Sequence, residues 1–168
     1  MKIGIISDTH GYCDEAIKRH VEDCDEIWHA GDLGEGVANQ LLTVRPLKAV
    51  FGNIDDKKTR ADFPEFLVFK CEEIKVLMIH IAGNPPAFNA QTKKLIQVHQ
   101  PNLLVYGHSH ILRIGKDQST GMVYINPGAA GQQGFHRKRT LVRIHCEQDK
   151  IKHAEVVELG ERGSIARS

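Results

Sequence analysis

The sequence predicts an α/β fold in one domain, and three observations support this. Strand-like apolar runs that end in polar loops alternate with helix-compatible segments in the first third of the chain, which is typical of parallel α/β units. A length of 168 residues suits one domain with a single core. Apolar residues make up 41% of the chain and charged residues 26%, as in ordinary globular proteins.

The first half of the chain contains three expected strands and two expected helices. The run from Lys2 to Ser7 is rich in isoleucine and opens into the loop Asp8-Thr9-His10-Gly11, which is typical of a buried strand ending at a polar loop. Two further runs end in the same way at Gly31-Asp32 and Gly52-Asn53. The expected strands span residues 2–7, 26–29 and 48–51, and the expected helices span residues 14–22 and 37–43.

The second half of the chain is expected to be richer in strands. Two apolar runs joined by Glu72-Glu73 predict a β-hairpin, and an irregular loop over residues 81–91 precedes a helix over residues 90–98. The hairpin strands span residues 65–71 and 74–80, and further strands are expected at 103–106, 111–115, 122–125, 140–146 and 151–159. We therefore expect one domain over residues 1–159 and a frayed tail over residues 160–168.

Charge and cysteine usage narrow the function classes. A formal net charge of +1 predicts no strong nucleic-acid surface. The apolar start of the chain is too short for a secretory signal and no run approaches the ~18 apolar residues of a membrane span, so we expect a cytoplasmic protein without a membrane partner. The cysteines form no C-x-x-C pair, which argues against a zinc ribbon or a disulfide framework and favours buried core residues.

Candidate metal ligands follow almost every predicted strand. Ligands gather at the carboxyl ends of strands in α/β sheets, so side chains at these positions are expected to meet at one rim. Taken singly, Asp8-x-His10 occurs often by chance, and Gly31-Asp32 and Gly52-Asn53 are common turn formers. Gly107-His108-Ser109-His110 is more specific, although a pair of surface histidines is the alternative. The fixed order of all these elements carries more weight than any one of them.

In this order, followed by Asn126-Pro127-Gly128, the motifs resemble those of the calcineurin-like metallophosphoesterase superfamily, and within it the compact bacterial and archaeal phosphodiesterase branch. The resemblance extends from Met1 to about Leu159. It implies a four-layer αββα sandwich of two mixed β-sheets flanked by helices, with a dinuclear metal centre. The implied ligands are Asp8, His10 and His110 for one metal, Asn53, His80 and His108 for the other, and Asp32 as the bridge between both.

Imidazole, carboxylate and amide ligands together suit two divalent transition-metal ions. Manganese is the expected metal, with Fe, Co, Ni and Zn as alternatives, whereas a site for Mg or Ca alone would normally use oxygen ligands. Two ions about 3.5–4 Å apart can generate hydroxide from a bridging water and clamp the phosphoryl oxygens during in-line displacement. We therefore expect a phosphodiesterase whose substrate is a small-molecule or nucleotide phosphodiester.

Two departures from the family pattern affect the expected mechanism. Many members have His where this chain has Ile54, and an aliphatic side chain cannot supply the general acid help that is typically worth about 10²–10⁴-fold in rate. Asn53 and Asp55 are the remaining catalytic candidates of this block, and Asp55 is expected to orient a neighbour. The auxiliary histidine that often follows the ligand at His80 is also absent, and residues 84–88 are expected to line the substrate entrance instead.

Other residues have two interpretations each. His29 either supports a metal ligand or is a strand-end histidine bonded to a backbone carbonyl, and Arg137 either binds a substrate phosphate or belongs to a solvated basic loop. For the whole protein, the alternative to an enzyme is a binding scaffold like the small retromer subunit, which resembles these enzymes and also lacks the third-block histidine. The complete ligand set favours the enzyme. The sequence leaves the oligomeric state open, a homo-oligomer included.

Overall fold

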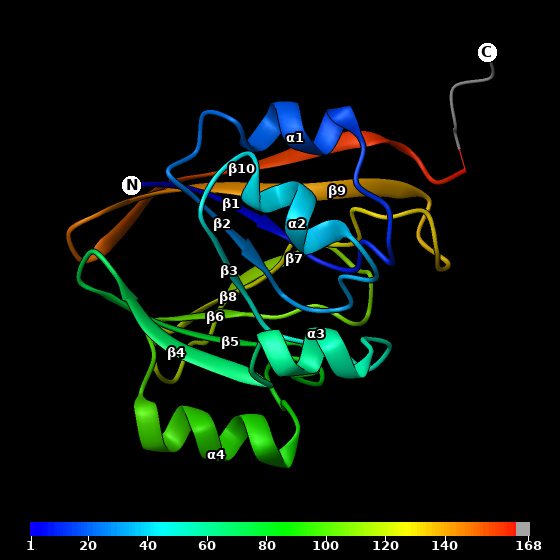
Figure 1. Cartoon of the computed structure of the whole chain (residues 1–168). Coiled ribbons are helices and arrows are strands. Elements are labelled where there is room, and N and C mark those ends of the chain that lie inside the picture. Colours follow the sequence, from blue (N-terminus) through cyan, green and yellow to red (C-terminus); the bar gives the residue numbers. More distant parts are fainter. Residues whose placement is uncertain (164–168) are drawn as a thin grey trace.

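The computed structural model describes residues 1–163, which form two five-stranded β-sheets packed face to face (Figure 1). The first sheet has the order β10-β9-β1-β2-β3, with β1, β2 and β3 parallel and the other neighbours antiparallel. Its strands are β1 (Lys2–Ile6), β2 (Glu26–His29), β3 (Leu47–Ala49), β9 (Lys138–Glu147) and β10 (Lys150–Glu161). This sheet therefore joins the first part of the chain to the last.

The second sheet is built from the middle of the chain. It has the order β4-β5-β6-β8-β7, with β5, β6 and β8 parallel and an antiparallel strand at each edge. Its strands are β4 (Phe66–Cys71), β5 (Ile74–Ile79), β6 (Leu103–Val105), β7 (Arg113–Lys116) and β8 (Val123–Asn126). The predicted hairpin is the antiparallel pair β4 and β5. Both sheets are mixed, as the resemblance implied.

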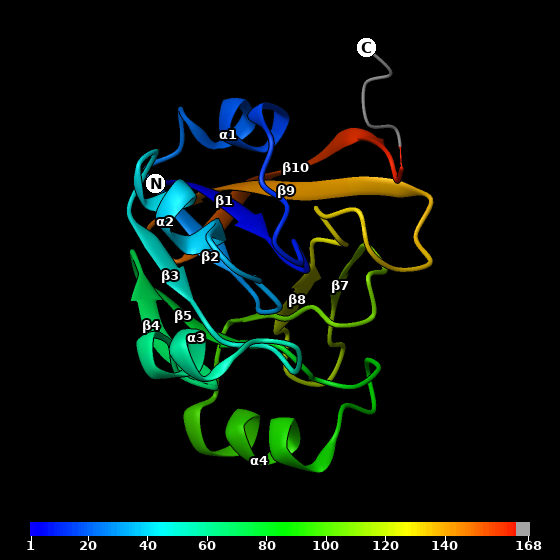
Figure 2. The same cartoon turned by 45° about the vertical axis from the view of Figure 1, so that its right-hand side comes forward.

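The helices are α1 (Glu15–Val21), α2 (Val37–Leu42), α3 (Lys57–Asp62) and α4 (Ala90–His99). Helices α1 and α2 cover the outer face of the first sheet and α4 covers that of the second (Figure 2). One apolar cluster lies between the sheets, a second joins α1 and α2 to the first sheet, and a third joins α4 to the second sheet. This arrangement confirms the expected four layers of helix, sheet, sheet and helix. The central strands β1, β5 and β6 bury apolar side chains on both faces because a layer covers each face.

Side-chain caps determine where three of the helices begin. Asp14, Asp56 and Asn89 each have extended backbone and accept a hydrogen bond from the backbone N–H three residues later. Such caps satisfy a backbone donor that the first turn of a helix leaves without a partner. The cap at Asp56 begins α3, which the sequence did not predict. Helix α3 buries none of its residues, so its sequence lacks the apolar periodicity by which a helix is recognised.

The carboxyl-terminal end of the chain differs slightly from expectation. Strand β10 continues through Gly160 and Glu161, which pair with Arg139 and Lys138, two residues beyond the expected start of a frayed tail. These pairs form because β9 is long enough to supply partners to the end of β10. The rest of that expected tail, residues 164–168, lies outside the described residues. Cys24, Cys71 and Cys146 are buried, as expected, whereas Cys13 is only half-buried, and all four cysteines are free thiols.

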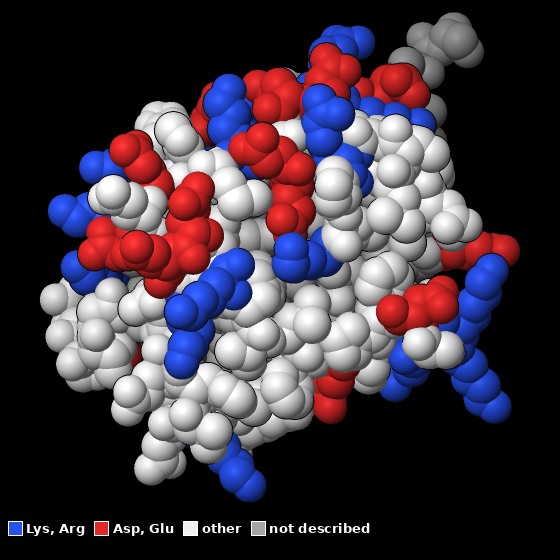
Figure 3. Space-filling view, turned by 60° about the vertical axis from the view of Figure 1, so that its left-hand side comes forward, with Lys and Arg blue, Asp and Glu red and all other residues white. Residues whose placement is uncertain are grey.

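One face of the molecule carries charges of both signs (Figure 3). Lys and Arg lie among Asp and Glu over its upper part, and uncharged residues cover most of its lower part. Opposite charges also pair on the surface, as in Lys2–Asp23 at 3.6 Å and Arg143–Asp23 at 2.8 Å. Within residues 1–163, none of the helices is long and apolar enough to cross a bilayer.

Candidate metal centre

The structure brings the seven predicted ligands together at the carboxyl ends of parallel strands from both sheets. Three polar loops follow β1, β2 and β3 of the first sheet, and two follow β5 and β6 of the second. Since the sheets are packed face to face, these ends meet at one rim. Backbone bonds tie neighbouring loops together, for example from the N–H of Asp8 to the carbonyl of Gly31 and from the N–H of Gly107 to the carbonyl of His80.

Asp8, His10 and His110 form the first cluster. One carboxylate oxygen of Asp8, Oδ2, accepts hydrogen bonds from the Ser7 hydroxyl at 2.6 Å and from the backbone N–H of His108 at 3.1 Å. The other oxygen, Oδ1, lies 3.3 Å from His110 Nε2, 3.8 Å from His80 Nε2 and 3.9 Å from His10 Nε2. The hydrogen bonds to Oδ2 thus hold the carboxylate so that Oδ1 faces three imidazoles.

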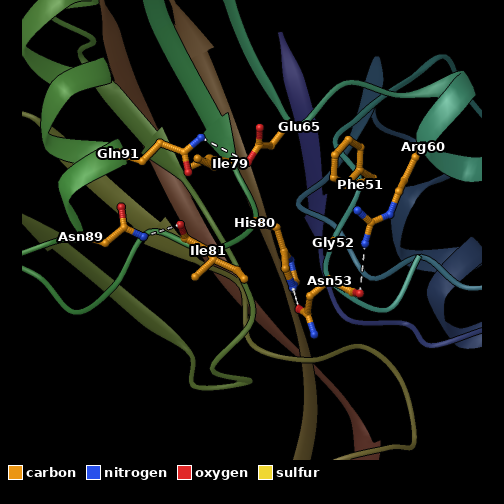
Figure 4. Close-up of a pocket in the computed structure, with 10 residues that line it drawn as sticks. All are labelled: Phe51, Gly52, Asn53, Arg60, Glu65, Ile79, His80, Ile81, Asn89 and Gln91. Atoms are coloured by element: carbon orange, nitrogen blue, oxygen red, sulfur yellow. Dashed lines mark hydrogen bonds between the residues drawn. The ribbon is translucent and has the colours of Figure 1, made fainter. Parts of the chain in front are cut away.

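Asn53, His80 and His108 form the second cluster together with Asp32. Figure 4 shows Asn53 beside His80. The side-chain oxygen of Asn53 lies 3.1 Å from His80 Nε2 and 3.0 Å from His108 Nδ1. His80 Nδ1 lies 2.7 Å from the carbonyl oxygen of Ala30, and because a carbonyl only accepts, Nδ1 carries the proton. In the neutral ring this leaves the lone pair on Nε2, which is the state that a metal ligand requires.

Asp32 lies between the two clusters. Its Oδ2 is 3.5 Å from His10 Nε2 in the first cluster and 3.2 Å from His80 Nε2 in the second. Its Oδ1 accepts a hydrogen bond of 3.0 Å from the backbone N–H of Ile54, which fixes the orientation of the carboxylate. A single carboxylate oxygen therefore faces both groups of candidate ligands. This is the position that the resemblance assigns to the bridging ligand.

The donor atoms are arranged to bind a pair of cations and not to form hydrogen bonds with one another. Asp8 Oδ1 and His10 Nε2 are buried, and within residues 1–163 neither has a hydrogen-bond partner. Buried polar atoms normally have partners, so such atoms at one place indicate a group that binds there. Each of the triads Asp8, His10, His110 and Asp32, His80, His108 offers ligand atoms within 4.8 Å of one another. Nitrogen and oxygen donors of this kind suit divalent transition metals.

Glycine is required where the loops approach the ligands most closely. A Cβ atom built on Gly52 would lie 2.1 Å from Asp32 Oδ1, and one built on Gly31 would lie 2.5 Å from His80 Nδ1. Neither position has room for any side chain. The glycines that the sequence showed before Asp32 and Asn53 are therefore explained by crowding around the ligands as well as by turn formation.

Five of the seven predicted ligands have a left-handed backbone, which L-residues rarely adopt. The φ angles are +54° at Asp8, +46° at His10, +56° at Asp32, +72° at His108 and +63° at His110. Such conformations cost on the order of 1–3 kcal/mol each and persist only where the surrounding structure enforces them. The strain is concentrated in the residues whose side chains converge, which indicates that the loops are shaped for the site and not for stability alone.

The local electrostatics keep the carboxylates ionised. Burial alone would raise the pKa of Asp8, but the neighbouring imidazole of His110 and the charge of His80 outweigh burial and lower the pKa. The pKa of Asp32 is lowered against the effect of burial by the hydrogen bond and charge of His80. Burial would lower the pKa of His80, but Asp32 and Asp8 raise it. Two buried negative charges at neutral pH favour the binding of cations.

Asp55 joins the loop that follows β3 to the loop that follows β2. Its side chain is 5% exposed, and its two carboxylate oxygens accept backbone N–H bonds from Gly52 at 2.8 Å, Gly34 at 2.9 Å and Leu33 at 3.2 Å. These bonds occupy both oxygens and hold Asn53 beside Asp32. The neighbouring Ile54, which stands where many members of the family have histidine, is 47% exposed. Because its side chain is aliphatic, it cannot transfer a proton.

His29 supports the loops without contributing a ligand atom. The Thr9 hydroxyl donates to the carbonyl of Leu33 at 2.7 Å, so it accepts from His29 Nε2 at 2.9 Å, while Nδ1 accepts from the N–H of Gly31 at 3.1 Å. The partners are therefore a hydroxyl and an amide N–H, not the backbone carbonyl considered from the sequence. Burial lowers the pKa of His29 to about 4, so the ring is neutral at physiological pH.

Two further side chains lie beside the centre and were not predicted. His136 donates from Nε2 to the carbonyl of Gly131 at 3.0 Å, and its ring centroid is 5.2 Å from that of His110. Arg60 donates to the carbonyls of Asp55 at 2.8 Å and Asn53 at 3.2 Å. Neither belongs to a sequence pattern that indicates chemistry. Arg137 is exposed, and within residues 1–163 no hydrogen bond or ion pair joins its side chain to the ligands, so its role stays a prediction.

Comparisons with known proteins agree with the geometry. A model of the calcineurin-like phosphoesterase superfamily domain matches residues 1–149. A protein of Methanothermobacter thermautotrophicus named a probable metallophosphoesterase is 32% identical over an alignment of 166 positions, which covers 95% of this chain and 94% of that protein. Among solved structures, an archaeal phosphodiesterase has a TM-score of 0.75 at 19% identity and covers 94% of this chain and 99% of its own. Wild-type Vps29 of Entamoeba histolytica, solved with zinc, has a TM-score of 0.72 at 17% identity over 95% of this chain and 100% of its own.

Proposed function

The chain belongs to the calcineurin-like phosphoesterase superfamily, and on that basis we propose that it is a phosphodiesterase dependent on two divalent metal ions. The observation that carries this proposal is the position of Asp32, whose Oδ2 faces His10 at 3.5 Å and His80 at 3.2 Å. A carboxylate shared in this way is what holds two mutually repelling cations close together. A protein with one metal would have no use for the second group of ligands.

We propose manganese as the metal, with iron, cobalt, nickel and zinc as alternatives, because the donor set mixes imidazole nitrogen with carboxylate and amide oxygen. When bound, two such ions supply a hydroxide nucleophile near neutral pH and positive charge that clamps the phosphoryl oxygens. The residues that would hold one ion are Asp8, His10 and His110, those that would hold the other are Asn53, His80 and His108, and Asp32 would contact both.

The protein contributes alignment and charge more than proton transfer. His80 is held in the required tautomer by the carbonyl of Ala30, and Asp32 is oriented by the N–H of Ile54. The exposed side chain of Ile54 offers no proton to a departing oxygen. Good leaving groups need the least protonation, so we propose that the substrates are small-molecule or nucleotide diesters with good leaving groups, and that unactivated monoesters react slowly.

Metal-stripped protein provides the direct test. Hydrolysis of bis-p-nitrophenyl phosphate and of p-nitrophenyl phosphate would be measured after addition of Mn²⁺, Ni²⁺, Zn²⁺ or Mg²⁺. We expect activity on the diester to return with a transition metal and to exceed activity on the monoester. Asp32→Ala should lose both activity and metal, whereas the exposed Asp149→Ala should lose neither. Equal recovery in Asp32→Ala would refute the shared ligand, and preference for the monoester would refute the substrate class.

A second candidate function, a protein-binding scaffold, has one observation in its favour. Phe135 is 102% exposed and Ile111 is 65% exposed, and both line a hollow of about 470 Å³ beside His108 and His110. Apolar side chains exposed together are often protein-binding surfaces. The scaffold would be favoured if no diester were hydrolysed with any metal while Phe135→Ser abolished binding of a partner protein.

A further inference from the structure

A cavity of about 310 Å³ opens directly beside Asn53 and His80 of the metal centre. Residues 84–88, which were expected to line the substrate entrance, do not line this cavity. Ile81 and Asn89, which flank that segment in the sequence, do. Small-molecule sites begin at roughly 300 Å³, so the cavity has room for an organic group in addition to the phosphate at the metal ligands. Because the cavity lies beside these ligands, an organic group that occupies it can belong to the same substrate molecule as the phosphate.

Two apolar side chains lie on opposite sides of this cavity (Figure 4). Phe51 lies on one side and Ile81, which is 39% exposed, lies on the other, with His80 and Asn53 between them at the end next to the metal centre. Arg60 packs over the ring of Phe51, with the guanidinium carbon 4.7 Å from the ring centroid, and bonds to the carbonyls of Asp55 and Asn53. The Phe51 wall is therefore fixed, and the two apolar walls suit a flat ring.

The end of the cavity away from the metal ligands presents hydrogen-bond acceptors. Gln91 Nε2 donates to Glu65 Oε1 at 3.2 Å, and both side chains lie at the end of the cavity away from His80 and Asn53 (Figure 4). Within residues 1–163, Glu65 Oε2 and Gln91 Oε1 have no hydrogen-bond partner. A ligand that reaches them must bring N–H or O–H donors, and a second phosphate would be repelled by the Glu65 charge.

We propose that this cavity binds one organic substituent of the diester, namely a flat heteroaromatic ring with an amino group on its far edge, as in an adenine nucleotide. The inference rests on the proposed function, because the metal centre must hold the phosphate. Phe51 and Ile81 enclose the ring, and Glu65 and Gln91 accept from the amino group. Ile81 and Glu65 are thus specificity-determining residues, and neither is a metal ligand.

Isothermal titration calorimetry on the Mn²⁺-loaded protein tests the ring and the amino group separately. Methyl phosphate and phenyl phosphate differ only in the organic group, and we expect phenyl phosphate to bind roughly tenfold more tightly, as burial of part of a ring predicts. Ile81→Ala should reduce that ratio to about twofold. Ile114→Ala, which makes the same substitution at a side chain that is 43% exposed on β7, should leave the ratio unchanged.

Adenosine and inosine 5′-monophosphates differ at the position of the amino group. We expect the adenosine form to bind about fivefold more tightly to the wild type, as a hydrogen bond to a charged acceptor predicts. Glu65→Gln should remove this preference, whereas the exposed Glu147→Gln should retain it. Equal affinities of the two nucleotides for the wild type would overturn the role of Glu65. Equal affinities of methyl and phenyl phosphate would overturn the cavity as a ring site.

The binding measurement also separates this inference from the proposed function. Ring-selective binding without hydrolysis of any diester would refute the phosphodiesterase and leave the ring site standing. Hydrolysis of diesters without ring selectivity in the wild type would refute the ring site alone. If none of the phosphates binds to the Mn²⁺-loaded protein, both proposals are wrong.

Discussion

Replacing Asp55 with alanine should destabilise the protein severely, because this side chain joins two ligand-bearing loops. The carboxylate is 5% exposed and accepts three backbone N–H bonds, at 2.8 Å from Gly52, 2.9 Å from Gly34 and 3.2 Å from Leu33. Hydrogen bonds to a charged group contribute about 1.5–3 kcal/mol each, and a buried donor left without a partner adds to the loss. The low end of that range for three bonds predicts a loss of roughly 4–5 kcal/mol in the free energy of unfolding.

Asp55→Asn should be milder. Its single carbonyl oxygen can keep the two bonds that Oδ2 accepts from Gly52 and Leu33, while its NH₂ group faces the N–H of Gly34. One bond is then lost and the charge is removed, for which we expect a loss of roughly 2 kcal/mol.

Urea denaturation of metal-stripped protein measures both losses, provided that the denaturant slope stays constant. Asp56→Ala is the matched control, because Asp56 makes a single exposed capping bond of 2.9 Å to the N–H of Thr59 and its loss should cost about 1 kcal/mol. If Asp55→Ala is no less stable than Asp56→Ala but has lost diesterase activity, Asp55 acts in the chemistry and the structural role is wrong.

Three further predictions concern residues around the metal centre. Ile54→His should raise turnover of p-nitrophenyl phosphate at least tenfold by restoring part of the general acid contribution of about 10²–10⁴, and unchanged turnover would show that the acid is supplied elsewhere. Because burial lowers the pKa of His29 from 6.5 to about 4, the unfolded chain binds the extra proton first as pH falls. The wild type should therefore lose roughly 3 kcal/mol of stability between pH 6.5 and pH 4, at about 1.36 kcal/mol per pKa unit, and urea denaturation should show no such loss in His29→Asn. His10 has a φ of +46°, so metal-free His10→Gly should be more stable than His10→Ala by about 1 kcal/mol, and a difference near zero would mean that the backbone there is not strained.

Much of the fold could be predicted from local patterns. The apolar runs that became β1, β2 and β5 are followed by polar loops, and the helices α1 and α4 are preceded by Asp14 and Asn89, whose side chains cap helices in any context. These preferences act within a few residues and are therefore visible in the sequence. Helix α3 was missed because it buries no residues, so its formation depends on the cap at Asp56 and not on an apolar face.

For the metal centre, the sequence by itself determined the identity and order of the candidate ligands and the glycines beside them, because chemistry restricts which residue types can bind a metal. Only the tertiary structure decided that one oxygen of Asp32 faces both ligand groups, that the Asp55 carboxylate is used by backbone N–H groups, and that Arg60 and Phe51 form a wall of the cavity. Those contacts join residues that are up to dozens of positions apart, and they exist because the packing of two sheets brings the ends of their strands to one rim. A local pattern carries no information about that approach, since the distances depend on the whole core.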